Sequence, residues 1–202
     1  MSYVVYPVAN YKFGTKDAKE EKPGGPDARW QRRREAYETS GVRRTVKAVV
    51  LVHVHSHPHV LVLVDQRGIA DLPGGRLKPD EPETDGLCRK LDRQMGPKES
   101  DLAVKWEVAE CLGTFWRPNF DPVLYPYLPP HVTRPKESVR VFFVGIPDQC
   151  RFQVPKNYTL KAVPLFQLYD NGHKYGPLLG AVPVLLSRLY LQADEQAIKT
   201  ED

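Results

Sequence analysis

Gly75-Arg-Leu-Lys-Pro-Asp-Glu81-Pro-Glu-Thr-Asp-Gly-Leu-Cys-Arg89-Lys-Leu91-Asp-Arg93-Gln-Met-Gly96 is the most informative segment of the chain, because several of its residues keep a long fixed spacing. Residues 83 to 95 are expected to form a helix. Positions 90, 93 and 94 then lie about one turn apart on a single helix face. That face carries Lys90, Arg93 and Gln94, so it presents two cations and an amide to any ligand.

The spacing resembles the signature of the Nudix family, G-x5-E-x7-R-E-U-x-E-E-x-G-U, in which U is apolar. Five residues fall in register, namely Gly75, Glu81, Arg89, Leu91 and Gly96. The three glutamates of the helix are missing, and Pro97 holds the last apolar place. The resemblance implies a Nudix-type α/β/α sandwich with a mixed β-sheet, an N-terminal arm and helix, and a C-terminal helix.

The activity of Nudix enzymes is not expected here. Those enzymes cleave diphosphates linked to another group, with magnesium held by the glutamate cluster. Magnesium requires oxygen ligands, and a face with Lys90 and Arg93 should repel it. The remaining acids Glu81, Glu83, Asp85 and Asp92 are interpreted as a solvated helix start that favours the helix dipole. The residues therefore predict no catalytic site, no bound metal and no cofactor.

Composition places few limits on function. With 202 residues and 41% hydrophobic content, the chain is long enough to bury a full core. Its 29 basic and 25 acidic residues give a net charge of +4, which is compatible with nucleic acid. Three widely spaced cysteines, with no Cys-x-x-Cys pair, favour a reducing intracellular compartment. No segment has the apolar length of a membrane span, and no signal peptide is visible.

The expected organisation is an N-terminal arm and basic helix (residues 1–40), a domain (41–192) that the resemblance implies is Nudix-like, and a flexible tail (193–202). Valine-rich runs predict strands. A charged helix should end at Ser40-Gly41, and Pro183 should bend or divide the last helix. The expected elements are helices at 28–39, 83–95 and 177–192, and strands at 45–53, 60–65, 104–112 and 139–146.

Four histidines occupy alternating positions across the hairpin expected between the first two predicted strands, starting at the last residue of the first strand. They are His53, His55, His57 and His59. A metal site is one interpretation, because histidine is a common metal ligand. No cysteine or carboxylate accompanies them, so a polar loop is the preferred interpretation.

Further short sequence motifs narrow the resemblance within the Nudix family. Between the predicted strands at 104–112 and 139–146 lies an excursion rich in proline and aromatic residues, residues 115–131. It contains Trp116-Arg-Pro-Asn-Phe-Asp-Pro and Tyr125-Pro-Tyr-Leu-Pro, and it is followed by Thr133-Arg-Pro-Lys-Glu137. Elsewhere stand Gly41-Val-Arg-Arg-Thr-Val46, Leu72-Pro-Gly-Gly75, Val154-Pro-Lys-Asn-Tyr158 and Pro164-Leu-Phe-Gln-Leu-Tyr-Asp-Asn171. From about Tyr6 to Tyr190 the chain is similar to the small Nudix subunits of cleavage factor Im, a part of the pre-mRNA cleavage and polyadenylation machinery.

That resemblance implies a nuclear homodimer that binds a UGUA element in single-stranded pre-mRNA and pairs with a larger subunit bearing an RNA-recognition domain. It also implies that RNA lies over the cleft that a nucleotide would occupy. The bases are then recognised by hydrogen bonds to their edges and by stacking on aromatic rings. The positions that match the family's RNA-contacting residues are Glu21, Arg29, Lys47, Ile69, Ala70, Leu72, Tyr175 and Gly176.

Two departures bear on specificity. The family keeps two phenylalanines where this chain has Ile69 and Ala70, and an acidic residue where it has Lys47. Stacking of a base on an aromatic ring contributes roughly 1–3 kcal/mol per base. A lysine in place of a carboxylate would donate hydrogen bonds to a base instead of accepting them, so the base preference at this place would be reversed. Lys47 would instead suit a phosphate. Three interpretations therefore stay open: an RNA-binding scaffold with weakened or altered specificity, a protein-interaction subunit with little RNA reading of its own, and a residual nucleotide-binding protein.

Overall fold

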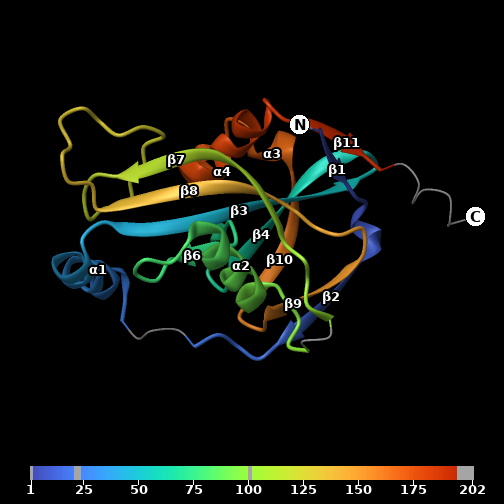
Figure 1. Cartoon of the computed structure of the whole chain (residues 1–202), viewed down its shortest axis with the longest axis horizontal. Coiled ribbons are helices and arrows are strands. Elements are labelled where there is room, and N and C mark those ends of the chain that lie inside the picture. Colours follow the sequence, from blue (N-terminus) through green and yellow to red (C-terminus); the bar gives the residue numbers. More distant parts are fainter. Residues whose placement is uncertain (1, 21–23, 100–101, 195–202) are drawn as a thin grey trace, which may run out of the picture.

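A computed structural model of the chain describes residues 2–20, 24–99 and 102–194. Its centre is a mixed seven-stranded sheet in the order β10–β4–β3–β8–β7, with β5 beside β4 and β6 beside β3 (Figure 1). The strands of this sheet are β3 (Arg43–Val54), β4 (His57–Asp65), β5 (Ala70–Asp71), β6 (Gly74–Arg76), β7 (Glu107–Arg117), β8 (Glu137–Gly145) and β10 (Tyr158–Pro164).

Helices cover both faces of this sheet. On one side, here called the α2 face, helix α2 (Glu83–Gln94) buries Leu87 and Leu91. On the other side, the α4 face, lie α3 (Leu165–Leu168) and α4 (Gly172–Leu186). Strand β3 is buried on both sides, because Val49 packs on the α4 face and Val50 on the α2 face. The expected α/β/α sandwich with a mixed sheet is confirmed.

Two pairs of short strands outside the central sheet were not predicted from the sequence, and within that sheet β5, β6 and β10 were not predicted either. β1 (Ser2–Val5) pairs in parallel with β11 (Tyr190–Ala193), and β2 (Tyr11–Lys16) pairs in parallel with β9 (Cys150–Pro155). A 3-10 turn, η1 (Val8–Asn10), joins β1 to β2. Each pair joins residues more than a hundred positions apart, a distance over which local patterns carry no information. In the expected tail, Asp194 N still donates to Val5 O, while residues 195–202 lie outside the described part.

The last helix differs from the prediction at both ends. It begins at Gly172 rather than 177 and ends at Leu186 rather than 192. It is interrupted at Gly176, where φ is 84° and ψ is 167°, and not at Pro183 as expected. Glycine tolerates this positive φ, and the following Pro177 disfavours helical geometry at the residue before it. Pro177 thus begins a second helical segment.

The strand expected at residues 104–112 begins later and runs further, because β7 continues to Arg117 along its neighbour β8. The first residues of the proline- and aromatic-rich excursion are therefore part of the sheet. Trp116 and Tyr125 then pair backbone to backbone, with N–O distances of 2.7 and 2.8 Å, and close the first part of the excursion.

The histidines do not share one loop, which corrects the interpretation made from the sequence. Only His55 lies in the turn, where it and Ser56 have φ values of 48° and 63° in a two-residue hairpin connection. His53 is buried in β3, with Nε2 3.1 Å from Asp194 O, and His57 and His59 belong to β4. Across the described residues, no three His, Cys, Asp or Glu side chains are grouped as metal ligands.

Cys88, Cys111 and Cys150 are free thiols. No helix within the described ranges has both the length and the apolar character needed to cross a bilayer.

Candidate RNA-binding face

Helix α1 (Pro26–Ser40) carries the first described candidate, Arg29, on its exposed side. Pro26 occupies the first turn, and Gly41 follows the last turn with a φ of 68° and donates its N–H to Tyr37 O. No residue of α1 is fully buried, so the helix is anchored by polar contacts rather than by an apolar stripe. Glu21, the other candidate from this region, lies outside the described residues.

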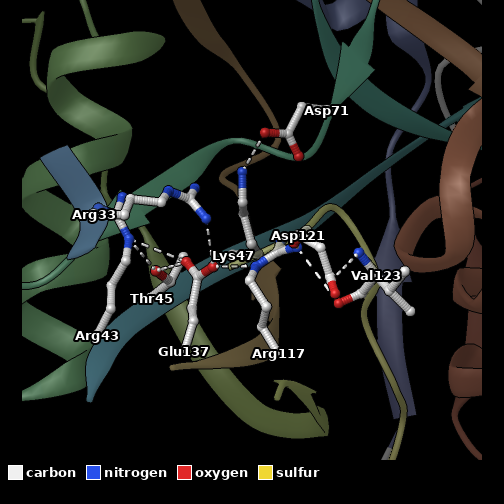
Figure 2. Close-up of polar contacts among 9 residues, drawn as sticks. All are labelled: Arg33, Arg43, Thr45, Lys47, Asp71, Arg117, Asp121, Val123 and Glu137. Atoms are coloured by element: carbon white, nitrogen blue, oxygen red, sulfur yellow. Dashed lines mark hydrogen bonds and ion pairs between the residues drawn. The ribbon is translucent and has the colours of Figure 1, made fainter. Parts of the chain in front are cut away.

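Lys47 lies on β3 and is engaged within the protein. Its Nζ lies 2.5 Å from Asp71 Oδ2 (Figure 2). The same Nζ lies 2.9 Å from Leu72 O. The Lys47 side chain is 12% exposed, whereas that of Asp71 is 59% exposed. The lysine therefore holds a carboxylate at the surface, and its own charge is largely neutralised by that partner.

The segment before the Gly74-Gly75 turn presents no aromatic ring. Ile69 is 60% exposed, Ala70 packs at the edge of the apolar cluster of the α4 face, and Leu72 is buried within it. Ile69 is held by its backbone, since its N–H donates to Asp65 Oδ1 at 2.9 Å. A base at this position would meet an aliphatic side chain.

Tyr175 and Gly176 lie in the first part of α4. Tyr175 packs against the same apolar cluster as Ala70 and Leu72, and Lys174 Nζ lies 5.2 Å from the Tyr175 ring centroid. The structure therefore brings Lys47, Ala70, Leu72 and Tyr175 to one side of the sheet, the α4 face. Asp71 joins them through Lys47.

Beside this group, one buried carboxylate gathers three arginines. Glu137 accepts hydrogen bonds from Arg33 (3.1 Å), Arg43 (3.1 Å) and Arg117 (2.8 Å), and from the Thr45 hydroxyl (2.7 Å) (Figure 2). Arg43, Glu137 and Arg117 form a row across β3, β8 and β7, because their strands pair in that register.

The three guanidinium groups decide the charge of Glu137. Burial alone would raise the pKa of its carboxyl group, but Arg33, Arg117, Thr45 and Arg43 outweigh burial and lower the pKa to about 2. The carboxylate is therefore ionised throughout the physiological range, and it ties α1 to the sheet.

One of the substituted residues of the motif helix α2, Gln94, has a structural role. Gln94 Oε1 accepts from Gly74 N at 2.7 Å, and Gln94 Nε2 donates to Gly74 O at 2.9 Å. A side chain at Gly74 would clash with the β3 backbone, since a Cβ there would lie 2.2 Å from Val46 O. The glycine turn is thus explained by close packing and by the amide of Gln94.

The remaining glutamates of the motif are paired with arginines. Arg89 Nε and Nη2 donate to the two carboxylate oxygens of Glu81 at 2.7 Å each. Arg89 and the Lys78 N–H lower the pKa of Glu81 to about 2. Glu83 accepts from Arg140 Nη1 at 2.5 Å, and Arg44 Nη2 lies 3.7 Å away.

Asp71, Gln94 and the Glu137 network were not predicted as parts of a site from the sequence. Asp71 was passed over because no local pattern links it to Lys47, which lies 24 positions earlier. Gln94 was noted only as a lost glutamate, although a glutamine twenty residues after a tight glycine turn is chemically able to bond both groups of one peptide.

Comparisons with known proteins agree with this architecture. A model of the Nudix family, described as nucleotide hydrolases, matches residues 1–189. Among solved structures, a bifunctional NMN adenylyltransferase/ADP ribose pyrophosphatase from Francisella tularensis superposes with a TM-score of 0.50 at 15% identity, over 81% of this chain and 46% of that one. At that identity the likeness concerns the fold alone. The chain therefore belongs to the Nudix family.

Two relatives of similar length define its place within that family. Pre-mRNA cleavage factor Im 25 kDa subunit 2 of Arabidopsis thaliana is 47% identical over 94% of this chain and 96% of its own. Cleavage and polyadenylation specificity factor subunit 5 of Dictyostelium discoideum is 41% identical over 92% and 94%. The chain groups with the 25 kDa subunits of pre-mRNA cleavage factor Im, as its excursion suggested.

Proposed function

We propose that this chain is a non-catalytic, RNA-binding scaffold subunit of the nuclear machinery that cleaves and polyadenylates pre-mRNA. The observation that carries this proposal is the 41–47% identity to cleavage factor subunits over more than nine-tenths of this chain. A role in pre-mRNA cleavage and polyadenylation follows from that kinship. Residues of the α4 face support the proposed RNA contacts, and residues of α2 support the lack of hydrolysis.

The absence of hydrolysis is supported by the charge of α2. Where Nudix enzymes have glutamates, Lys90 and Arg93 offer no oxygen ligand, and Gln94 is occupied by Gly74. Glu81 and Glu83 are each engaged by arginine. We therefore expect no turnover of dinucleoside polyphosphates or capped nucleotides with magnesium or manganese. Protein-dependent turnover that Glu81→Gln abolishes would contradict this.

RNA reading is proposed for the α4 face between α1 and α4, with the described residues named from the family resemblance: Arg29, Lys47, Ile69, Ala70, Leu72, Tyr175 and Gly176. Glu21, outside the described residues, is proposed as an RNA contact from the resemblance alone. We add Asp71 to this set as a hydrogen-bond acceptor. Its exposed carboxylate, held by Lys47, is suited to accept hydrogen bonds from base edges, the role that Lys47 itself cannot play. Without a ring at position 69 or 70, discrimination would depend more on hydrogen bonds than on stacking.

A titration with two RNA oligomers tests this proposal. Wild-type protein should bind single-stranded RNA containing UGUA more tightly than a scrambled oligomer, without added metal and with marked salt dependence. Asp71→Asn should weaken UGUA binding by about tenfold, in line with the roughly 1–3 kcal/mol of a base contact, and leave the scrambled oligomer unaffected. The exposed Asp80→Asn serves as the control. Equal, negligible binding of both oligomers by wild type would refute sequence reading by this chain alone.

A second candidate function, that of a protein-interaction subunit, is favoured by the excursion. It exposes large apolar side chains, with Val123 47%, Tyr127 57% and Leu128 39% exposed. Such side chains are typical of interface cores. We propose that they contact the larger subunit bearing an RNA-recognition domain, while a second copy of this chain completes a homodimer. Tyr127→Ser should then prevent co-purification of the larger subunit from nuclear extract while RNA affinity is kept. Unchanged recovery would count against this surface.

A further inference from the structure

A pocket rich in cations lies between α1 and the sheet, apart from the residues matched to RNA contacts in the family. It is a cavity of about 20 Å³, roughly the space of one water molecule. Five basic side chains line it, and the single acid among the lining residues is Glu137. The basic residues are Arg33, Arg43, Arg76, Arg117 and Lys136.

The positive charge of this pocket exceeds what Glu137 neutralises. Arg33, Arg43 and Arg117 share that one carboxylate. Arg76 and Lys136 form no side-chain hydrogen bond or ion pair with any residue in the described part of the chain. Burial, with repulsion from Arg43 and other arginines, lowers the pKa of Arg33 to about 10 in spite of Glu137. Cations crowded in this way gain from an anion placed among them.

Two aromatic rings complete the wall. Tyr37 and Phe120 pack edge to face with centroids 5.7 Å apart. Lys136 Nζ lies 4.2 Å from the centroid of the Tyr37 ring and 5.6 Å from that of the Phe120 ring. The ammonium group is therefore held beside the pocket by the rings, and not by a carboxylate that would compete with a ligand.

The pocket is continuous with the candidate RNA-binding face. On α1, Arg33 follows Arg29 by four residues, about one helical turn. On β3, Thr45 of the Glu137 network and Lys47 of the candidate face are two residues apart, so they lie on the same side of the strand. Arg76 pairs across from Thr45. Figure 2 shows Lys47 beside the Glu137 network. A strand of RNA on the α4 face would therefore pass this pocket when it extends toward α1.

We propose that this pocket binds a backbone phosphate of single-stranded RNA, outside the base-reading residues. Its small cavity admits a phosphate oxygen, and the rest of the group would lie at the mouth between Arg76 and Lys136. Such a contact would add affinity and position the strand without selecting sequence. The inference rests on the proposed function, because it requires that the chain binds RNA.

The test uses the full chain with Arg76→Gln, Lys136→Gln and their combination, since neither side chain takes part in the Glu137 network. Lys161→Gln removes one exposed positive charge from β10 and is the matched control. Binding of the UGUA and scrambled oligomers is measured by fluorescence anisotropy across a salt series, and thermal unfolding checks that each variant is folded.

The double variant should bind both oligomers more weakly by the same factor, about three- to tenfold. The slope of log K against log salt should shrink by about 0.7 for one lost phosphate contact. Lys161→Gln should stay within about twofold of wild type. Wild-type affinity and slope in the folded double variant would overturn the inference and leave the proposed function intact. A loss confined to the UGUA oligomer would also overturn it, by indicating a base contact. Failure of wild type to bind either oligomer would refute the RNA-binding function itself, and this inference with it.

Discussion

Glu137 is the residue on which the link between α1 and the sheet depends. It is 3% exposed and accepts bonds from three arginines and Thr45. Replacing it removes the only acid that balances Arg33, Arg43 and Arg117 among the residues lining their pocket. Removing one partner of a buried ion pair costs more than the pair contributes, because the remaining charges are left without compensation.

We expect Glu137→Gln to lower the free energy of unfolding at pH 7 by roughly 3–5 kcal/mol. The pKa of Glu137 is lowered to about 2 in the folded state, so its stabilisation is complete above its ordinary pKa of 4.5 and is lost as pH falls toward 2. The difference between wild type and variant should therefore shrink over that window. Urea denaturation at several pH values measures it, with the exposed Glu38→Gln as control. A difference that is constant from pH 7 to pH 2 would contradict the assignment.

Ile69 is the residue where base stacking can be restored. Its side chain is 60% exposed, so a larger ring there meets little of the protein. Ile69→Phe should tighten binding of the UGUA oligomer by roughly 1–3 kcal/mol, or about five- to 150-fold, because it supplies a stacking surface. Ile69→Leu changes the shape without adding a ring. Equal affinities of the two variants by anisotropy would show that no base lies at this position.

At the scale of elements, α2 is fastened to the Gly74 turn by one amide. Gln94 bonds both the N–H and the C=O of Gly74, on a helix that otherwise packs through Leu87 and Leu91. Gln94→Ala should lower stability by about 1–3 kcal/mol, because it leaves buried backbone groups without partners. Gln66→Ala, in an exposed turn, should change stability by less than about 0.5 kcal/mol. Equal effects in urea denaturation would show that the amide is dispensable.

At the scale of the whole molecule, α3 and α4 leave large apolar side chains on the outside. Phe166 is 74% exposed, and Val184 is 62% exposed. Exposed apolar surface of this kind often marks an interface. We expect sedimentation at micromolar concentration to give twice the 23.0 kDa chain mass, and Phe166→Ser with Val184→Ser to favour the monomer. Val123→Ser, on the excursion, is the control. A mass of one chain throughout the concentration range would contradict the proposed homodimer.

The sequence alone determined the features that depend on local patterns. The spacing of the Nudix signature and the valine-rich runs were enough to predict the Nudix fold, the central strands and α2. The sequence motifs of the excursion were enough to predict the kinship with cleavage factor Im. Hydrophobic periodicity and turn residues act over a few positions, so they can be read without a structure. Ile69 and Ala70 are named from the family resemblance, and a base contact at these two positions is a proposal.

Only the tertiary structure decided the contacts between distant segments. The pairing of β1 with β11 depends on residues far apart in the chain. The ion pair between Lys47 and Asp71 also joins residues that are separated in the chain. The same is true of the hydrogen bonds that Glu137 accepts from Arg33, Arg43 and Arg117. A lysine expected to suit a phosphate is neutralised by its neighbour. The segment expected only as a basic, charged helix supplies Arg33, which ties that helix to the sheet. Charge in a sequence is local, but its balance depends on which side chains the fold brings together.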